Sequence, residues 1–224
     1  MPAIKYSIIG SDYIGAFVVS TDKYVFIGGN APDKKVSAIE EALGVRAIRT
    51  SVMGSDLVGI FAKANSNGII FPSTVSDLEI KAIKELGLGI NIGILDTDMN
   101  ALGNNILVND KIAFINQDYN ISNARIIEDV FGVETARIVT GNFKTIGANN
   151  LLTNKGLIVN NNTTDEEKDI IDSMTGFKSV RSTANFGSLS IGLAATANSN
   201  GVIAGESTTG YELERIRQGL DIED

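Results

Sequence analysis

The sequence predicts an α/β protein of five β-β-α-β repeats, arranged as a five-bladed ring with pseudo-fivefold symmetry and with its helices outside. Three observations predict it. An apolar residue followed by an anchor glycine recurs at spacings of 44, 44, 44 and 45 residues, and a fixed period of this length marks a repeat architecture. The segment AKANSNG at 62–68 returns as ATANSNG at 195–201. The last repeat stops before its third strand. The anchor glycines are Gly15, Gly59, Gly103, Gly147 and Gly192.

Each repeat opens with a predicted β-hairpin. Six residues after the anchor glycine come turn-forming residues, with a short apolar run on each side, as in 17–19 and 24–27. Short apolar runs around a turn signal are typical of paired antiparallel strands. The five turns are Thr21-Asp22, Asn65-Ser66, Asn109-Asp110, Thr153-Asn154 and Asn198-Ser199.

A helix follows each hairpin. In three repeats it opens with Ser/Thr-x-x-Glu, a pattern in which the two side chains cap each other's backbone N–H groups. These pairs are Ser76 with Glu79, Thr164 with Glu167, and Thr209 with Glu212. The first repeat has Pro32 near its helix start, where a missing N–H costs little. Glycine tolerates the left-handed backbone of a helix end, so we expect the helices to end near Gly44, Gly87, Gly132, Gly176 and Gly219.

A third apolar run follows the helix in four repeats, at Val45–Ile48, Ile90–Leu95, Thr135–Val139 and Lys178–Arg181. The fifth repeat lacks it, because the remaining segment 220–224 is short and acidic. The apolar segment Ile4–Ile9 precedes the first anchor glycine as the third strands precede theirs. We therefore expect it to complete the fifth unit and close the ring, which leaves no exposed repeat edge. Residues 1–224 would then form a single domain.

Composition excludes several classes of function. The chain has no cysteine and no histidine, so disulfides, thiolate nucleophiles, zinc sites built on Cys or His, and Ser-His-Asp triads are impossible. Its net charge of −8 disfavours a groove for nucleic acid, which would need many Lys and Arg side chains. The sequence shows neither an N-terminal signal peptide nor an apolar run of about 18 residues. We expect a cytoplasmic protein, monomeric, with no membrane contact.

No motif indicates a cofactor or metal. Gly87-Leu88-Gly89 lacks the third glycine of a dinucleotide site and follows a helix rather than a strand. Asp96-Thr97-Asp98 is better explained as a turn than as a cation site. We interpret the anchor glycines as structural, since they let backbones crowd near the axis or start the first strand.

Two features remain as candidates for binding. Asn104-Asn105 and Asn149-Asn150 follow anchor glycines on what should be the innermost strands, although asparagine is a poor strand residue. They line either a water-filled channel or, at Asn104 above all, a recognition surface. The loops before the anchor glycines should all emerge on one face, and their larger apolar side chains suit a protein interface or a covering of the core. These side chains are Tyr13, Leu57, Met99, Phe143, Phe186 and Leu189.

In order and spacing, a set of short motifs spread over the whole chain resembles the translation initiation factor 6 family, which has the pentein fold, or α/β-propeller. The motifs are ALGN at 101–104, TIGAN at 145–149, TNKG at 153–156, STAN at 182–185 and STTGYEL at 207–213. The chain lacks the C-terminal tail of eukaryotic members and so resembles the archaeal form. Pentein enzymes that modify guanidines use a Cys nucleophile with His, both absent here.

The resemblance implies binding to the joining face of the large ribosomal subunit, chiefly to a uL14-type ribosomal protein near the sarcin–ricin loop. It implies no catalysis and no cofactor; bound there, the factor blocks the small subunit, with a possible role in large-subunit biogenesis. It places Asn104, of the ALGN motif, at the interface, together with the residue after the second anchor glycine, here Ile60 in place of the frequent arginine. With the loops, the candidate ribosome-binding residues are Asn104, Ile60, Asp12, Tyr13, Asp56, Leu57, Asn100, Phe143, Phe186 and Leu189.

The sequence is also compatible with two other functions. The ring could be a binding module for a different protein. It could also be a pentein enzyme that relies on Asp or Glu alone, which the missing Cys and His disfavour.

Overall fold

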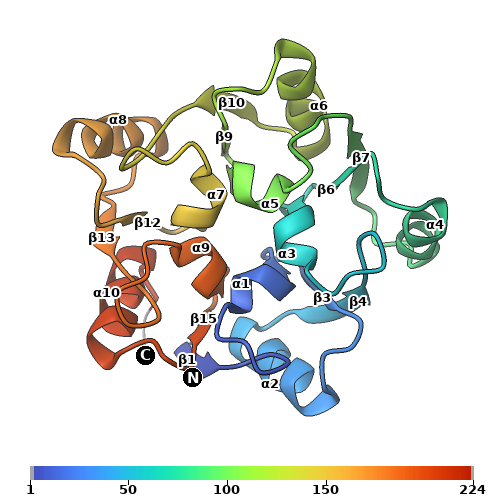
Figure 1. The fold of residues 1–224 in the computed structure, drawn as a ribbon, viewed down its shortest axis with the longest axis horizontal. Helices are drawn as coiled ribbons and strands as arrows, with labels where there is room; N and C mark the ends of the chain where they lie inside the picture. Colours follow the sequence, from blue (N-terminus) through green and yellow to red (C-terminus); the bar gives the residue numbers. More distant parts are fainter. Residues whose placement is uncertain (1–2, 223–224) are drawn as a thin grey trace.

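The computed structural model describes residues 3–222. In this part of the chain there are five three-stranded sheets, arranged around a common centre with one long helix outside each (Figure 1). The sheets are β2 (Val18–Ser20), β3 (Tyr24–Gly28) and β4 (Arg46–Thr50); β5 (Lys63–Ala64), β6 (Gly68–Pro72) and β7 (Asn91–Leu95); β8 (Ile106–Val108), β9 (Ile112–Ile115) and β10 (Glu134–Arg137); β11 (Leu151–Leu152), β12 (Leu157–Asn160) and β13 (Val180–Ser182); β14 (Ala195–Ala197), β15 (Val202–Gly205) and β1 (Ala3–Tyr6).

Every sheet has the same topology. The middle strand pairs antiparallel with the hairpin strand before it and parallel with the third strand. The middle strands β6, β12 and β15 are buried along their whole length. They are apolar on both faces because each sheet is covered on both sides by its neighbours.

The N-terminal strand completes the fifth sheet. Ala3 pairs with Val202 and Tyr6 with Gly205, in parallel. The strand ends at Tyr6, earlier than the sequence indicates, and Ile8 instead forms a bridge with Ser11. The predicted pairing of this segment with the fifth unit is confirmed, and β1 lies beside β15 (Figure 1). The last two residues of the acidic segment 220–224 lie outside the described residues.

The long helices are α2 (Asp33–Leu43), α4 (Asp77–Glu85), α6 (Ile121–Phe131), α8 (Asp165–Thr175) and α10 (Gly210–Leu220). The three predicted capping boxes are present on α4, α8 and α10, and a fourth, Asn120 with Asn123, opens α6. The sequence pattern missed it because asparagine can replace both the hydroxyl and the carboxylate of the box.

The helix ends agree with the expectation except at the last helix. Gly44, Gly132 and Gly176 are left-handed C-caps. Gly87, which has a positive φ, directly follows Leu86, the C-cap of α4. Gly219 lies inside α10, and Asp221 takes the left-handed position instead. A Cβ at Gly219 would lie 2.7 Å from the Cβ of Val180. The glycine is therefore needed for close packing of the helix on the sheet and not for a cap.

Five inner helices of one turn each lie nearest the centre (Figure 1). The expectation that the anchor glycines start the first strands is wrong, since each is the second residue of an inner helix. The expected crowding is confirmed, because a Cβ on any anchor glycine would overlap the carbonyl oxygen of the preceding one, with Gly15 meeting Gly192. The inner helices are α1 (Ile14–Phe17), α3 (Val58–Phe61), α5 (Leu102–Asn105), α7 (Ile146–Asn149) and α9 (Ile191–Ala194).

The apolar core is divided among the sheets. In the described residues each cluster joins one face of a sheet, the facing side of the next sheet and the helix that covers them. Phe26 of β3 packs with Ile69 and Phe71 of the second sheet, whereas Val25 and Ile27 pack with Ile203 of the fifth. Alternate residues of one strand thus serve two different cores, as the two-residue period of a strand requires.

Candidate binding face

The residues that follow the anchor glycines occupy equivalent positions on the inner helices. They are Ala16, Ile60, Asn104, Ala148 and Leu193. The structure brings the two predicted site residues of this set, Ile60 and Asn104, onto the neighbouring helices α3 and α5, which are in contact. Both are half-buried. The amide oxygen Oδ1 of Asn104 is buried, and no donor in the described part of the chain reaches it.

The neighbouring asparagines have structural roles. Asn105 donates from Nδ2 to the carbonyl oxygen of Ala101 at 2.9 Å, and its Oδ1 accepts from Asn116 at 2.7 Å. Asn150, fully buried, donates to the carbonyl oxygen of Ile146 at 2.8 Å and to Thr140 Oγ1 at 2.9 Å. Their amides are satisfied by protein groups, so the water-filled-channel interpretation is wrong for these residues. Asn104, Asn105 and Asn149 lie in helices and not on strands, because the first strand begins only after the inner helix.

Tight turns precede four of the five inner helices and are called tip turns here. Each is closed by a bridge between its ends, at 8 with 11, 52 with 55, 140 with 143, and 184 with 188. Each holds at least one non-glycine residue in the left-handed region: Ile9 at φ 51°, Met53 at φ 56°, Asn142 at φ 67° and Phe186 at φ 60°. This conformation is costly, most of all for the β-branched Ile9.

The tip turns expose large apolar side chains. Phe186 is 83% exposed, Ile9 53% and Met53 37%, and Tyr13, just after the first turn, is 44% exposed. Tyr13 and Phe186 were predicted site residues; Ile9 and Met53 were missed. Their signal was present, because each precedes a glycine and a serine in a turn-like Gly-Ser pair, one residue before the loop was expected to start.

Leu57, Phe143 and Leu189 are half-buried, as is Asn100, whose Oδ1 is also buried without a donor in the described residues. These side chains are less accessible than those of Tyr13 and Phe186. The structure therefore divides the predicted set into exposed aromatic side chains, partly covered ones and the unpaired amides of Asn100 and Asn104.

Asp12 and Asp56 tie neighbouring repeats together. Asp56 accepts hydrogen bonds from the Asn30 backbone N–H at 3.0 Å and from Asn30 Nδ2 at 2.8 Å. Asp12 accepts from the backbone N–H of Ser207 at 3.2 Å and from its hydroxyl. In the fourth repeat Lys144 holds the same place and forms an ion pair with Asp118 at 2.9 Å. These side chains are occupied by contacts between repeats.

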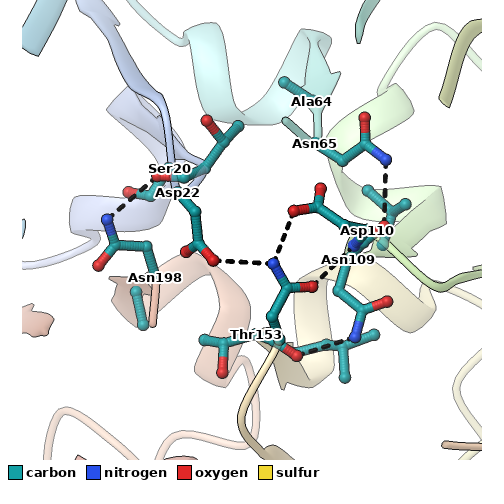
Figure 2. Close-up of a pocket in the computed structure, with 13 residues that line it drawn as sticks. Ser20, Asp22, Ala64, Asn65, Asn109, Asp110, Thr153 and Asn198 are labelled. Atoms are coloured by element: carbon teal, nitrogen blue, oxygen red, sulfur yellow. Dashed lines mark hydrogen bonds between the residues drawn. The ribbon is translucent and has the colours of Figure 1, made fainter. Parts of the chain in front are cut away.

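Side chains of the hairpin turns from different repeats gather around one small pocket (Figure 2). Asn154 donates from Nδ2 to Asp22 Oδ2 at 2.8 Å and to Asp110 Oδ2 at 2.6 Å, so one amide joins two carboxylates from different repeats. Asp22 also binds the backbone and hydroxyl of Ser199, at 2.8 and 2.7 Å. A cavity of only about 20 Å³ remains there. In the described part of the chain no three acidic side chains gather as a metal site would require.

Lys63 of β5 lines a cavity of about 30 Å³ on the axis, together with Gly59, Leu107 and Thr196. No hydrogen bond or ion pair within the described residues reaches its ammonium group, and burial lowers the pKa of Lys63 to about 8. Lys63 is half-buried, so the charged form is destabilised by the partial loss of water.

Replacing Lys63 with methionine should stabilise the protein at pH 7 by about 1–2 kcal/mol, because a half-buried charge without a protein partner is removed. The pKa of the folded lysine lies below its unfolded value near 10.4, so its penalty is complete below pH 8 and fades between pH 8 and about 10.4. Denaturant unfolding over that pH range measures the effect. The exposed Lys23→Met is the control, and a loss of stability in Lys63→Met would contradict the interpretation.

The described residues contain no helix that combines the length and the apolar character needed to cross a membrane.

The sequence of the chain matches the family model described as eIF-6 over residues 3–219. The chain belongs to the eIF-6 family. Its family relatives include the translation initiation factor 6 of Thermoplasma acidophilum, 37% identical over 95% of this chain and 96% of that one. The same factor of Pyrococcus abyssi is 37% identical over 95% of both chains, and that of Picrophilus torridus is 35% identical over 96% and 98%. The resemblance derived from the motifs is thus confirmed.

Membership of the eIF-6 family places the chain among initiation factors of protein biosynthesis, and these relatives carry the name of an initiation factor, which is not the name of an enzyme. An agmatine deiminase of C. jejuni is also similar in structure, with 12% identity and a TM-score of 0.37 over 56% of this chain and 50% of that chain. So slight a likeness bears on neither fold nor function.

Proposed function

We propose that this protein binds the large ribosomal subunit and prevents the small subunit from joining it, without catalysing a reaction. The observation that carries the proposal is the family match across nearly the whole chain, together with an unpaired amide oxygen of Asn104 on the inner-helix side. A buried acceptor without a partner costs free energy, and a partner that donates a hydrogen bond there would recover it.

The partner we propose is a uL14-type ribosomal protein near the sarcin–ricin loop, in the cytoplasm. The charge of the chain, −8, is complementary to a basic ribosomal protein and would speed its encounter. The factor would act as a monomer and by occupancy alone, so that binding and blocking are one event. A role in maturation of the large subunit is compatible with the same contact.

We further infer that residues 1–224 form one domain, a closed five-bladed α/β-propeller. The pairing of β1 with β15, the contact of Gly15 with Gly192 and the core shared by the first and fifth sheets support this inference.

The replacement Asn104→Leu, which removes the acceptor Oδ1, should weaken binding to the large subunit by about 1–3 kcal/mol, the usual cost of losing a buried interface hydrogen bond. Folding should change little, since Asn104 is only half-buried and its side chain bonds to nothing else in the described residues. Co-sedimentation with purified large subunits measures binding, and subunit association in the presence of the variant measures blocking. The control is Gln218→Leu, the same loss of an amide on the outer helix α10.

Subunit joining should recover in proportion to the binding that Asn104→Leu loses. A variant that binds normally yet no longer blocks joining would refute occupancy. Wild-type protein that leaves large subunits unbound would instead favour a binding module for a different protein.

A further inference from the structure

The capping-box glutamate of α4 makes more contacts than a helix cap requires. Glu79 binds the backbone N–H of Ser76 at 3.0 Å, as the capping box demands. The same carboxylate also accepts hydrogen bonds from the tip turn of its repeat: from Met53 N–H at 3.1 Å, Gly54 N–H at 2.9 Å and the Ser51 hydroxyl at 2.6 Å. One side chain therefore joins the start of an outer helix to a tip turn.

The fifth repeat has the same connection between its outer helix and its tip turn. Glu212 of α10 binds Thr209 N–H at 2.8 Å within its capping box. It also accepts from Phe186 N–H at 3.2 Å, Gly187 N–H at 2.8 Å and the Thr183 hydroxyl at 2.7 Å. The contacts fall on the tip turn that exposes Phe186, the most exposed large apolar side chain of the described residues.

Burial alone would raise the pKa of Glu79, but the hydrogen bonds from Ser51, Gly54 and Ser76 outweigh it and lower the pKa to about 2. In Glu212, burial is likewise outweighed by hydrogen bonds from Thr209, Thr183 and Gly187, so its pKa is lowered. Both carboxylates are ionised at neutral pH, and hydrogen bonds to an ionised acceptor are roughly twice as strong as neutral ones.

The tip turns need such support. Met53 and Phe186 have left-handed backbone conformations. Residues other than glycine keep this costly conformation only when several surrounding contacts hold it in place. Both side chains are exposed, Phe186 far more than Met53, whose sulfur accepts a hydrogen bond from the Thr74 hydroxyl at 2.8 Å. The bonds to Glu79 and Glu212 are made by the backbone of the turns and not by these two side chains. What they determine is where the two side chains stand on the binding face.

We propose that Glu79 and Glu212 are positioning residues for partner binding, holding Met53 and Phe186 in the orientation in which the large ribosomal subunit meets them. This rests on the proposed function. A turn whose backbone is already fixed loses less entropy on binding, which raises affinity without any new contact. The fourth repeat offers a matched contrast, because Glu167 binds the tip-turn Gly141 N–H at 2.8 Å but the exposed residue of that turn is the polar Asn142.

The test compares Glu212→Gln, Glu79→Gln and Glu167→Gln, with Phe186→Ser as the variant that removes the presented side chain. Amide hydrogen exchange of Gly187, Gly54 and Gly141 should accelerate about tenfold or more in the corresponding glutamine variant. Co-sedimentation with large subunits should weaken about fivefold to tenfold for Glu212→Gln and Glu79→Gln. It should stay within about twofold of wild type for Glu167→Gln.

A double-mutant cycle separates positioning from general destabilisation. If Glu212 acts through Phe186, adding Glu212→Gln to Phe186→Ser should weaken binding by less than about twofold more. Fully additive losses, or equal losses in Glu167→Gln, would overturn the positioning role. Unchanged amide exchange would show that the glutamates do not hold the tip turns, whatever the binding result. If exchange is faster in the glutamine variants but the wild-type protein does not bind large subunits, the glutamates hold the tip turns and the ribosomal partner is refuted.

Discussion

Alanine in place of Gly15 should unfold the protein or lower its free energy of unfolding by more than about 3 kcal/mol, beyond the usual cost of overpacking, because the clash is with backbone. The new Cβ would overlap the carbonyl oxygen of Gly192 and lie 2.6 Å from that of Ala195. Neither carbonyl can rotate away as a side chain could. The clash falls between the first and the fifth repeats, so it also tests the junction between them.

The control is Gly210→Ala, at the start of α10, where a Cβ would meet no atom within 4 Å. Alanine favours a helix over glycine by about 1 kcal/mol, so this variant should be as stable as wild type or slightly more so. Thermal and denaturant unfolding of both variants are the measurement. If Gly15→Ala unfolds at the same denaturant concentration as wild type, the inner helices do not pack as closely as the structure has them.

Removal of the N-terminal strand should cost roughly 3–5 kcal/mol or more, a large part of the stability of an ordinary domain. A variant that starts at Gly10 exposes the edge of β15, which pairs with β1 over Ala3–Tyr6. It also removes Ile8, which is fully buried, and Ile4 and Tyr6, which pack against the core shared by the first and fifth sheets.

A synthetic peptide of residues 1–9 should restore part of the lost stability, because the strand pairs by backbone contacts that need no covalent link. The full-length variant Lys5→Ala controls for the strand's exposed side chain and should unfold like wild type. Equal midpoints for the truncated and full-length proteins would mean that β1 is dispensable and that the closed ring is not what stabilises the fold.

Local signals predicted most of the fold. The hairpin turns at 21–22 and 109–110, the capping boxes and the left-handed glycines after α2, α6 and α8 depend on interactions between residues a few positions apart. Such interactions are visible in a short stretch of chain. Even the place of the N-terminal strand followed from counting, because a repeat that lacks one strand needs a substitute.

The site was harder, because its properties depend on residues far apart in sequence. Asn104 and Asn105 are adjacent and chemically identical, yet Asn105 bonds to Asn116 whereas Oδ1 of Asn104 has no donor in the described residues. Asp12 and Asp56, which were expected at the binding surface, also hold Ser207 and Asn30 of other repeats, a contact that no local pattern indicates.

The sequence alone therefore determined the repeat period, the helix caps and the turns. The number of repeats, the order of the elements and the exclusion of cysteine and histidine chemistry follow from residue types and spacing. Only the tertiary structure decided which role a given glycine or carboxylate has. Gly219 fits a helix against Val180, and Gly15 fits one backbone against another. Glu79 and Glu212 cap a helix and brace a tip turn at once. These roles arise where separate repeats or loops meet within van der Waals or hydrogen-bonding distance, and no local pattern encodes such a meeting.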